Sequence, residues 1–418
     1  MKKIAAINCL SIAFLLILST NTLFAFDTTI TGKSDSSYDV KAVQDAVDKG
    51  GSVLLKGTFD FGKKGRVNIK NDVEISGEID EAGRYLTKVV GGFWTFHSPL
   101  PSTELPIPTP GPKVKIEKIH FDGATRAPLH FAYTSGIEIL NNKITNVLPL
   151  SYPYKWKGGD NLLLNAGILL GNRFVHMEKI LPGAVTGRLI FNNNSVDLKC
   201  KKPEITMGQG VYSIYTWGAI IEIKGNTFRN VSRNSIETLD NYVGDEGKGN
   251  ILIADNNIVT PPVGIPFPSP KTPNGIMVGW FLNKSGGSDP ALLSKISIVR
   301  NYVQANGETS LGIASLADGV SVLGNHVEVG GGAKSIGIFQ VGSNGFIARN
   351  KIDGSGAWAL NVGPYKVYKG NGNTLAWNDF TDFEGSSGDF YSGGNKNTFV
   401  GAKCSIVNKG EGNILLTQ

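Results

Sequence analysis

The stretch Ile251-Leu-Ile-Ala-Asp-Asn256-Asn-Ile258 carries the pattern that decides the fold. An apolar residue stands at the first, third and last positions, and an asparagine stands at the sixth. The same pattern recurs along most of the chain, with its asparagine always at the same place. These asparagines are Asn142, Asn194, Asn226, Asn256, Asn301, Asn325, Asn350, Asn378 and Asn397. An earlier copy around Ile116 and Phe121 has Ile119 where the asparagine would stand.

The spacing of the copies indicates stacked coils. From Ile119 onward the steps are 23, 52, 32, 30, 45, 24, 25, 28 and 19 residues. A basic coil of about 24 residues with insertions explains every step except the short last one. Apolar residues alternate on both sides of the asparagine, which predicts a strand, a tight bend and a second strand. An asparagine can take the left-handed conformation of a bend, and its amide can bond to the next asparagine, so an internal ladder is expected.

A further strand recurs between the asparagines, as in Gly275-Ile-Met-Val278 and Gly312-Ile-Ala-Ser315. Each coil is therefore predicted to contain three strands. A single coil cannot bury its apolar face, so the coils must stack and equivalent strands must pair in parallel. One residue of this strand points outward in each coil. These outward residues are His130, Leu169, Tyr212, Glu237, Met277, Ala314, Phe339 and Leu360.

Residues 39–49 precede the coils and have the period of a helix, with Val43, Ala46 and Val47 on one face. Ser37 or Asp39 can cap the start of this helix, and Gly50-Gly51 ends it. Together with the coils, these features resemble the right-handed parallel β-helix proteins of the pectate-lyase-like superfamily, over about residues 37–418. The resemblance implies an all-β, single-stranded right-handed parallel β-helix. It also implies that the helix caps the open end of the stack.

The domain organisation follows from these segments. Residues 1–25 are predicted to be a signal peptide that is removed, because a charged start is followed by a short apolar stretch and small residues. Residues 26–52 form the N-terminal cap and residues 53–418 the β-helix. No later apolar run is long enough to cross a bilayer. The mature protein is therefore expected to be exported, to an extracellular, periplasmic or cell-surface location.

Composition excludes several classes of protein. The 53 glycines and the 18% of charged residues argue against a helical bundle. The net charge is +6, but the lysines and arginines form no dense block, so a nucleic-acid partner is not expected. Cys200 and Cys404 lie seven coils apart, or about 30 Å at the usual strand spacing. A disulfide between them is excluded, so each is expected to be reduced or paired with another chain.

Four insertions outline a groove over the outward row: residues 148–164, 173–187, 260–273 and 283–294. Two precede the row and two follow it, so they wall it from both sides. Glu237 is the only carboxylate in the row and is the candidate acid or base for a reaction on a sugar. Arg233 and Asp240 flank it. The competing interpretation is an exposed glutamate that pairs with these neighbours for structural reasons.

Aromatic and basic residues around this row suit a sugar ligand, since flat rings stack on pyranose faces and cations hold carboxylates. The candidates are Tyr212, Tyr215, Trp217 and Trp280 near the row, with Trp156, Lys155 and Lys157 on the first insertion. The alternative is that the aromatics pack the loops against the solenoid and that the lysines lie on a solvated loop tip.

Catalytic signatures of the superfamily are absent. The Asn-Thr-Asp, Asp-Asp, Gly-His-Gly and Arg-Ile-Lys motifs of the polygalacturonase branch do not occur, and the row offers no aspartate cluster for calcium. The histidines have no zinc-ligand spacing, so no metal or cofactor is predicted. Two functions stay open. One is a polysaccharide lyase or glycoside hydrolase acting on an acidic polysaccharide, and the other is a non-catalytic glycan-binding or adhesin-like solenoid. The oligomeric state is not predicted.

Overall fold

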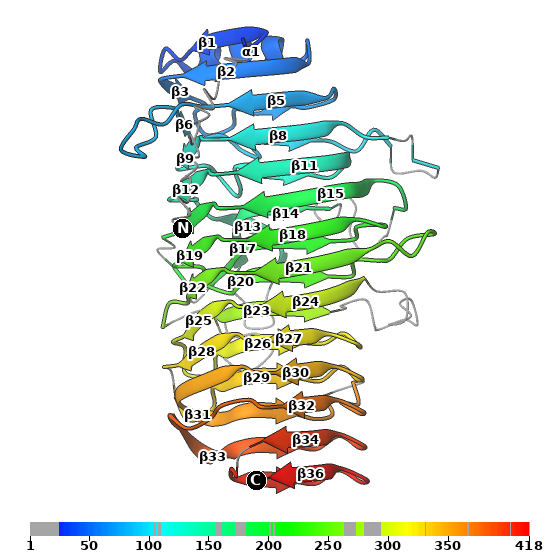
Figure 1. The fold of residues 1–418 in the computed structure, drawn as a ribbon. Helices are drawn as coiled ribbons and strands as arrows, with labels where there is room; N and C mark the ends of the chain where they lie inside the picture. The colour runs from blue at the N-terminus through cyan, green and yellow to red at the C-terminus, as the bar shows by residue number, and fades with distance from the viewer. Residues whose placement is uncertain are drawn as a thin grey trace, which may run out of the picture.

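The chain winds into one long stack of coils with a helix at its N-terminal end (Figure 1). The computed structural model describes residues 25–102, 106–107, 110–155, 161–171, 181–199, 202–203, 205–262, 273–279, 294–330, 332–365, 368–401 and 403–417. Residues 1–24, which hold nearly all of the predicted signal peptide, lie outside the described residues. Among the described residues, no helix combines the length and the hydropathy needed to cross a membrane.

The first strand of each coil belongs to a 14-stranded parallel sheet. Its strands, in spatial order, are β1 (Thr28–Thr31), β2 (Gly51–Lys56), β5 (Val73–Ser76), β8 (Lys113–Glu117), β11 (Thr134–Leu140), β15 (Val185–Asn192), β18 (Ile220–Lys224), β21 (Asn250–Ala254), β24 (Lys295–Val299), β27 (Ser321–Leu323), β30 (Phe346–Ala348), β32 (Thr374–Ala376), β34 (Thr398–Gly401) and β36 (Ile414–Thr417). Each strand pairs with its equivalent one coil away, as the repeat predicts.

The second and third strands of the coils form two rows within a 22-stranded sheet. The second row contains β3 (Thr58–Asp60), β6 (Lys88–Val90), β9 (His120–Asp122), β12 (Lys143–Thr145), β16 (Ser195–Asp197), β19 (Thr227–Arg229), β22 (Asn257–Val259), β25 (Tyr302–Ala305) and β28 (His326–Val329). The third row contains β4 (Val67–Asn68), β7 (Phe96–Ser98), β10 (Leu129–Phe131), β14 (Asn161–Leu170), β17 (Thr206–Ile214), β20 (Asn234–Leu239), β23 (Asn274–Gly279), β26 (Leu311–Ser315), β29 (Ile336–Gln340), β33 (Phe383–Ser392) and β35 (Ile406–Asn408).

Two strands depart from this plan. The long strand β31 (Lys351–Val362) pairs with both β28 and β29 and so joins the second and third rows. Strand β13 (Leu150–Lys155) runs antiparallel to β14 within the first insertion. The inward residues of all three rows fill one continuous apolar core, in which Ile251, Ile253 and Ile258 of a single coil are fully buried. Three strands per coil around one core is the predicted architecture.

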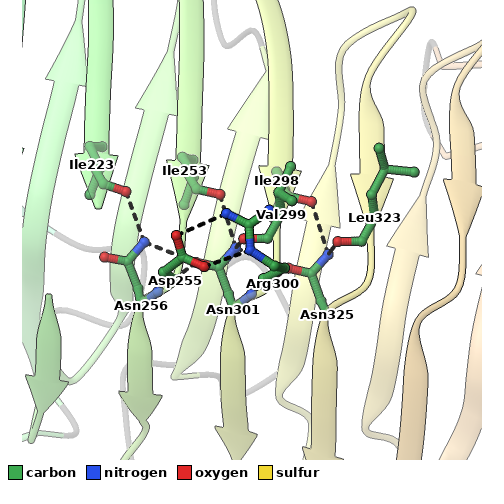
Figure 2. A network of polar contacts seen from close by, with 10 residues as sticks. All are labelled: Ile223, Ile253, Asp255, Asn256, Ile298, Val299, Arg300, Asn301, Leu323 and Asn325. Atoms are coloured by element: carbon green, nitrogen blue, oxygen red, sulfur yellow. Dashed lines mark hydrogen bonds and ion pairs between the residues drawn. The ribbon is translucent and has the colours of Figure 1, made fainter. Parts of the chain in front are cut away.

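The asparagine ladder is present and runs along one inner corner (Figure 2). The Asn256 backbone N–H donates to Oδ1 of Asn301 at 3.0 Å, and the Asn256 side-chain Nδ2 donates to the same oxygen and to the Ile223 carbonyl. The same backbone bond, 2.8–3.1 Å long, links each member from Asn142 to Asn378. Before the first member, the Ile119 N–H donates to Asn142 Oδ1. The ladder therefore satisfies the buried backbone groups of the bend.

The left-handed residue of the bend is not the asparagine, so that part of the prediction is wrong. The residue before each ladder asparagine takes this conformation, with φ of 55° at Asp255, 53° at Arg300 and 60° at Gly324. Such a bend turns its left-handed residue outward and the next side chain inward. Asp255 and Arg300 consequently form an ion pair at 2.8 Å outside the coil, while the asparagines line its inside (Figure 2).

Asn397 does not belong to this ladder, which corrects the ninth predicted position. It lies in a second ladder at the corner that leads into the 14-stranded sheet, between Asn373 and Asn413. The Asn373 N–H donates to Asn397 Oδ1 at 2.8 Å, and the Asn397 N–H donates to Asn413 Oδ1 at 2.7 Å. The short step of 19 residues from Asn378 to Asn397 thus joins two different corners of the coil.

The capping helix α1 spans Ser36–Val47, three residues earlier at its start than the pattern predicted. Its N-cap is Asp35, whose carboxylate accepts from the Ser37 and Tyr38 backbone N–H groups. Asp39 is buried and does not cap the helix. Its carboxylate accepts from the N–H groups of Lys33, Asp35 and Asp60. It therefore fastens the helix to the first coil, and Val43, Ala46 and Val47 close the core beneath.

Cys404 has no disulfide partner among the described residues, and burial raises the pKa of its thiol to about 11. Cys200 lies outside the described residues.

We predict that Asn256→Leu destabilises the stack by about 1–3 kcal/mol, because the Asn226 donors and the Ile223 carbonyl lose their buried partner. The matched control is Asn257→Leu, at the exposed neighbour in the same coil. It should change the free energy of unfolding by less than about 0.5 kcal/mol. Urea unfolding of both variants measures the difference, and equal midpoints would contradict the ladder's role.

Candidate functional site

The predicted outward row exists in the third row of strands. Register pairs His130 with Leu169, Leu169 with Tyr212, Tyr212 with Glu237, and Glu237 with Met277. The row continues to Ala314 and Phe339. Its next member is Asn361 and not the predicted Leu360, which pairs with Ile338 and lies in the core. Upstream, the row extends to His97.

The middle of this row is covered, whereas the sequence predicted an open groove floor. Tyr212 and Glu237 are each 1% exposed, and every residue from 231 to 242 is buried. A second apolar cluster lies on this outer face, beside the main core. It contains Trp94, Ala127, Ala166, Leu169, Tyr212, Ile214, Tyr215 and Leu239. Tyr212 is thus buried among apolar side chains although it points away from the main core.

Glu237 is the centre of a polar network within this covered face. Its Oε2 accepts from Gln209 Nε2 and from Asn234 Nδ2, both at 2.6 Å. Its Oε1 lies 3.9 Å from Nη2 of Arg233, and both side chains of this ion pair are almost fully buried. The structure therefore brings together two of the three predicted catalytic candidates.

The amides around Glu237 were not predicted. Asn274 Nδ2 donates to Asn234 Oδ1 at 2.9 Å, and Asn274 Oδ1 accepts from the Leu311 N–H at 3.1 Å. Gln209, Asn234 and Asn274 pair in register, each three residues before a member of the outward row. That recurring amide is the signal by which the sequence could have shown them. The network spans four consecutive coils, from β17 to β26.

Asp240 belongs to a neighbouring corner of the same coil. It is fully buried and takes a left-handed conformation, with φ of 51°. Its backbone accepts from the Tyr215 N–H and donates to the Gly279 carbonyl. Burial raises the pKa of Tyr368, and the negative charge of Asp240 adds to that rise. The described bonds of Asp240 thus position the corner after β20 and do not join it to Glu237.

The predicted aromatic candidates separate into three groups. Tyr212 and Tyr215 are buried in the outer cluster. Trp217 is partly exposed, packs against the main core and lies 5.7 Å from the ring of Tyr242. Trp156, Lys157 and Trp280 lie outside the described residues, and Lys155 is described only as the last residue of β13.

A cluster of rings and cations adjoins the N-terminal end of the row. The rings of His97 and His130 stack at 4.8 Å, and Trp94 lies 4.1 Å from His130. The guanidinium groups of Arg66 and Arg126 lie over Trp94 at 5.0 and 5.3 Å. Burial lowers the pKa of His97 to about 4 and holds that of His130 well below its usual value. Both histidines are therefore neutral at pH 7.

Metal ligands are not grouped in the described part of the chain: no three His, Cys, Asp or Glu side chains there lie close enough to hold an ion.

Comparison with known proteins places the fold and nothing finer. No family model and no curated protein matches the chain. Among solved structures, PfbA, a surface adhesin of Streptococcus pneumoniae, is 13% identical over 90% of this chain and 92% of its own, with a TM-score of 0.50. The fold is a right-handed parallel β-helix. This confirms the predicted fold class.

Two further structures are less similar in shape. The A-module of the mannuronan C-5 epimerase AlgE6 of Azotobacter vinelandii is 12% identical over 91% of this chain and 90% of its own, with a TM-score of 0.43. A mannuronic-acid-specific family 6 polysaccharide lyase from human gut microbiota is 11% identical over 91% of this chain and 83% of its own, with a TM-score of 0.37. At these identities the likeness concerns the architecture alone.

We predict that the free energy of unfolding falls as the pH is lowered from about 6.5 toward 4. The pKa values of His97 and His120 are about 4 in the folded chain, against 6.5 for a free histidine. Between these values the unfolded chain binds more protons, so stability rises with pH by up to about 1.4 kcal/mol per pH unit for each histidine.

Urea unfolding across this pH range checks the slope. His130→Phe keeps an aromatic ring in the stack but removes a titrating group, so its slope should be shallower below pH 6.5 and unchanged above about pH 7. A wild-type stability that stays level down to pH 4 would contradict the prediction.

Proposed function

We propose that the chain is a secreted carbohydrate-active protein that binds polysaccharide at the outer face of the third strand row, around Glu237. The observation that carries the proposal is the buried Glu237–Arg233 pair with its amides. A solenoid folds through its inner core, and burying charges costs free energy unless they are paired and hydrogen-bonded. These charges and amides lie outside that core, and a few placed polar groups beside apolar and aromatic side chains are typical of ligand-binding sites.

The chemistry of this set favours an acidic sugar. Glu237 Oε1 lies beyond direct hydrogen-bond distance of Arg233, so this oxygen has capacity for a proton of the substrate. Elimination from a uronate requires a base and a cation that neutralises the sugar carboxylate. Glu237 and Arg233 would supply these two roles. Hydrolysis would instead require a second carboxylate, for which Asp240 is the proposed residue. A lyase is therefore the favoured enzyme.

A non-catalytic glycan-binding solenoid is the second candidate, and the burial of Glu237 favours it. A carboxylate that is 1% exposed and already accepts two amide donors does not meet a polymer unless the covering protein moves. Binding by exposed residues around the covered face requires no such movement. We propose that Trp217 and Trp280, with Trp156, Lys155 and Lys157 of the first insertion, contribute the sugar contacts in either case, and that the buried Tyr212 and Tyr215 do so only when the covering protein moves.

We predict that Glu237→Gln lowers the rate of polysaccharide cleavage at least about a hundredfold while binding persists, because the amide keeps the size of the side chain but cannot transfer a proton. The assay screens uronic-acid polysaccharides for unsaturated products and new reducing ends. The matched control is Glu138→Gln, at an exposed glutamate on the 14-stranded sheet. An active protein that keeps its full rate after Glu237→Gln would refute the catalytic role, and binding without any cleavage by the wild type would support the binder.

We predict that Trp156→Ala weakens polysaccharide binding by about 1–3 kcal/mol through lost contact with a sugar ring, with turnover of bound substrate retained. The control is Trp377→Ala, at a tryptophan that is 60% exposed beside the 14-stranded sheet. Isothermal titration measures both variants. Equal affinities would remove Trp156 from the binding surface.

A further inference from the structure

A cavity of about 550 Å³ lies between the outer face of the capping helix α1 and the loop that joins β3 to β4. The loop reads Phe61-Gly-Lys-Lys-Gly-Arg66. Gly62 has a φ of 55°, and a side chain at Gly65 would collide with the Phe61 carbonyl and with Val40 of the helix. The two glycines therefore let the loop lie against the helix, with Lys63 and Lys64 between them. The space is large enough for one or two sugar rings.

The lining of this cavity is positively charged. Lys41, Lys63, Lys64 and Arg66 stand against a single carboxylate, Asp45, which already pairs with Lys41. Within the described chain, no acidic side chain pairs with any of the other three cations. A surface with three unpaired cations attracts anions.

The nearby carboxylates of Asp35, Asp39 and Asp60 are held by backbone N–H donors and form no ion pair with the cations of the cavity. Asp35 accepts from the first turn of α1, and Asp39 accepts from three N–H groups. Asp60 accepts from the Gly62 N–H. None of the three carboxylates lines the cavity.

Arg66 lines the cavity and is held by two residues outside it. Its guanidinium is partly buried over the rings of Phe93 and Trp94, and its Nε donates to the Phe93 carbonyl at 3.1 Å. These contacts hold the guanidinium plane in place. The terminal nitrogens are the donors that bind a carboxylate in a bidentate manner, and a prepositioned guanidinium loses little entropy on binding.

We propose that this cavity binds the carboxylate of an acidic mono- or disaccharide. Arg66 forms the bidentate contact, Lys63 and Lys64 add charge, and the exposed part of Val40 offers an apolar contact to the ring. The site lies at the N-terminal end of the stack, and it does not depend on the function proposed for the Glu237 face. Arg66 also contacts the ring cluster that adjoins the row of Glu237, so the lysine variants are the test that is specific to the cavity.

Isothermal titration of the full chain with digalacturonate tests the proposal, with inorganic sulfate and the neutral disaccharide cellobiose as comparison probes. Digalacturonate should bind, and cellobiose should not. The Lys63→Gln/Lys64→Gln double variant and Arg66→Met should each weaken the affinity at least tenfold. The control Lys70→Gln, at an exposed lysine outside the cavity, should stay within twofold. The lysine variants have no packing role, so they test the site even if Arg66→Met unfolds.

Several outcomes would overturn the proposal. The first is no binding of digalacturonate, and the second is binding that the lysine variants leave unchanged. Sulfate binding as tight as digalacturonate would mean a simple anion site and reject the sugar. Loss of digalacturonate binding in Glu237→Gln but not in the double lysine variant would place the ligand at the Glu237 face instead. Binding that survives Glu237→Gln and fails in the lysine variants supports the cavity alone.

Discussion

The structure depends on one constraint, which is that a buried bend must find partners for its backbone groups in the adjacent coil. Each ladder asparagine meets this need with a single side chain. Its Oδ1 accepts from the preceding coil, and its Nδ2 donates back to a carbonyl of that coil. Unpaired groups at this depth would cost about 1–3 kcal/mol each. The ladder therefore keeps coils with inserted loops of very different length in one register.

That register also determines what the outer face can carry. Because equivalent residues of successive coils pair directly, an outward residue always has neighbours from the coils on either side. Leu169 and Tyr212 thereby contribute to an apolar layer, and Glu237 meets the amides of Gln209 and Asn234. The core and the candidate site are thus built from the two faces of the same strands. A change in register would disrupt both.

The sequence predicted those parts of the structure that repeat. The repeat of apolar residues and asparagines located the ladder and the outward row, because the same positions point inward or outward in every coil. Features of a single coil were missed. The sequence offered Ser37 or Asp39 as the N-cap of the helix, but Asp35 is the N-cap. The carboxylate of Asp39 instead accepts a hydrogen bond from the first coil. The burial of Glu237 was also missed, because alternation says which way a side chain points but not what covers it.

The ladder is directional, and this has a consequence for how such a chain varies over evolutionary time. Every backbone hydrogen bond of the ladder runs from the N–H of one asparagine to Oδ1 of the asparagine in the following coil. Each coil therefore offers the same donor to the coil after it and the same acceptor to the coil before it. Removing or duplicating a whole coil would leave the same kind of ladder bond between the coils that become neighbours. Length can therefore change in units of one coil, while a helix fastened by Asp39 still closes the N-terminal end. Gene duplication within the repeats would lengthen the outer face without requiring a new fold.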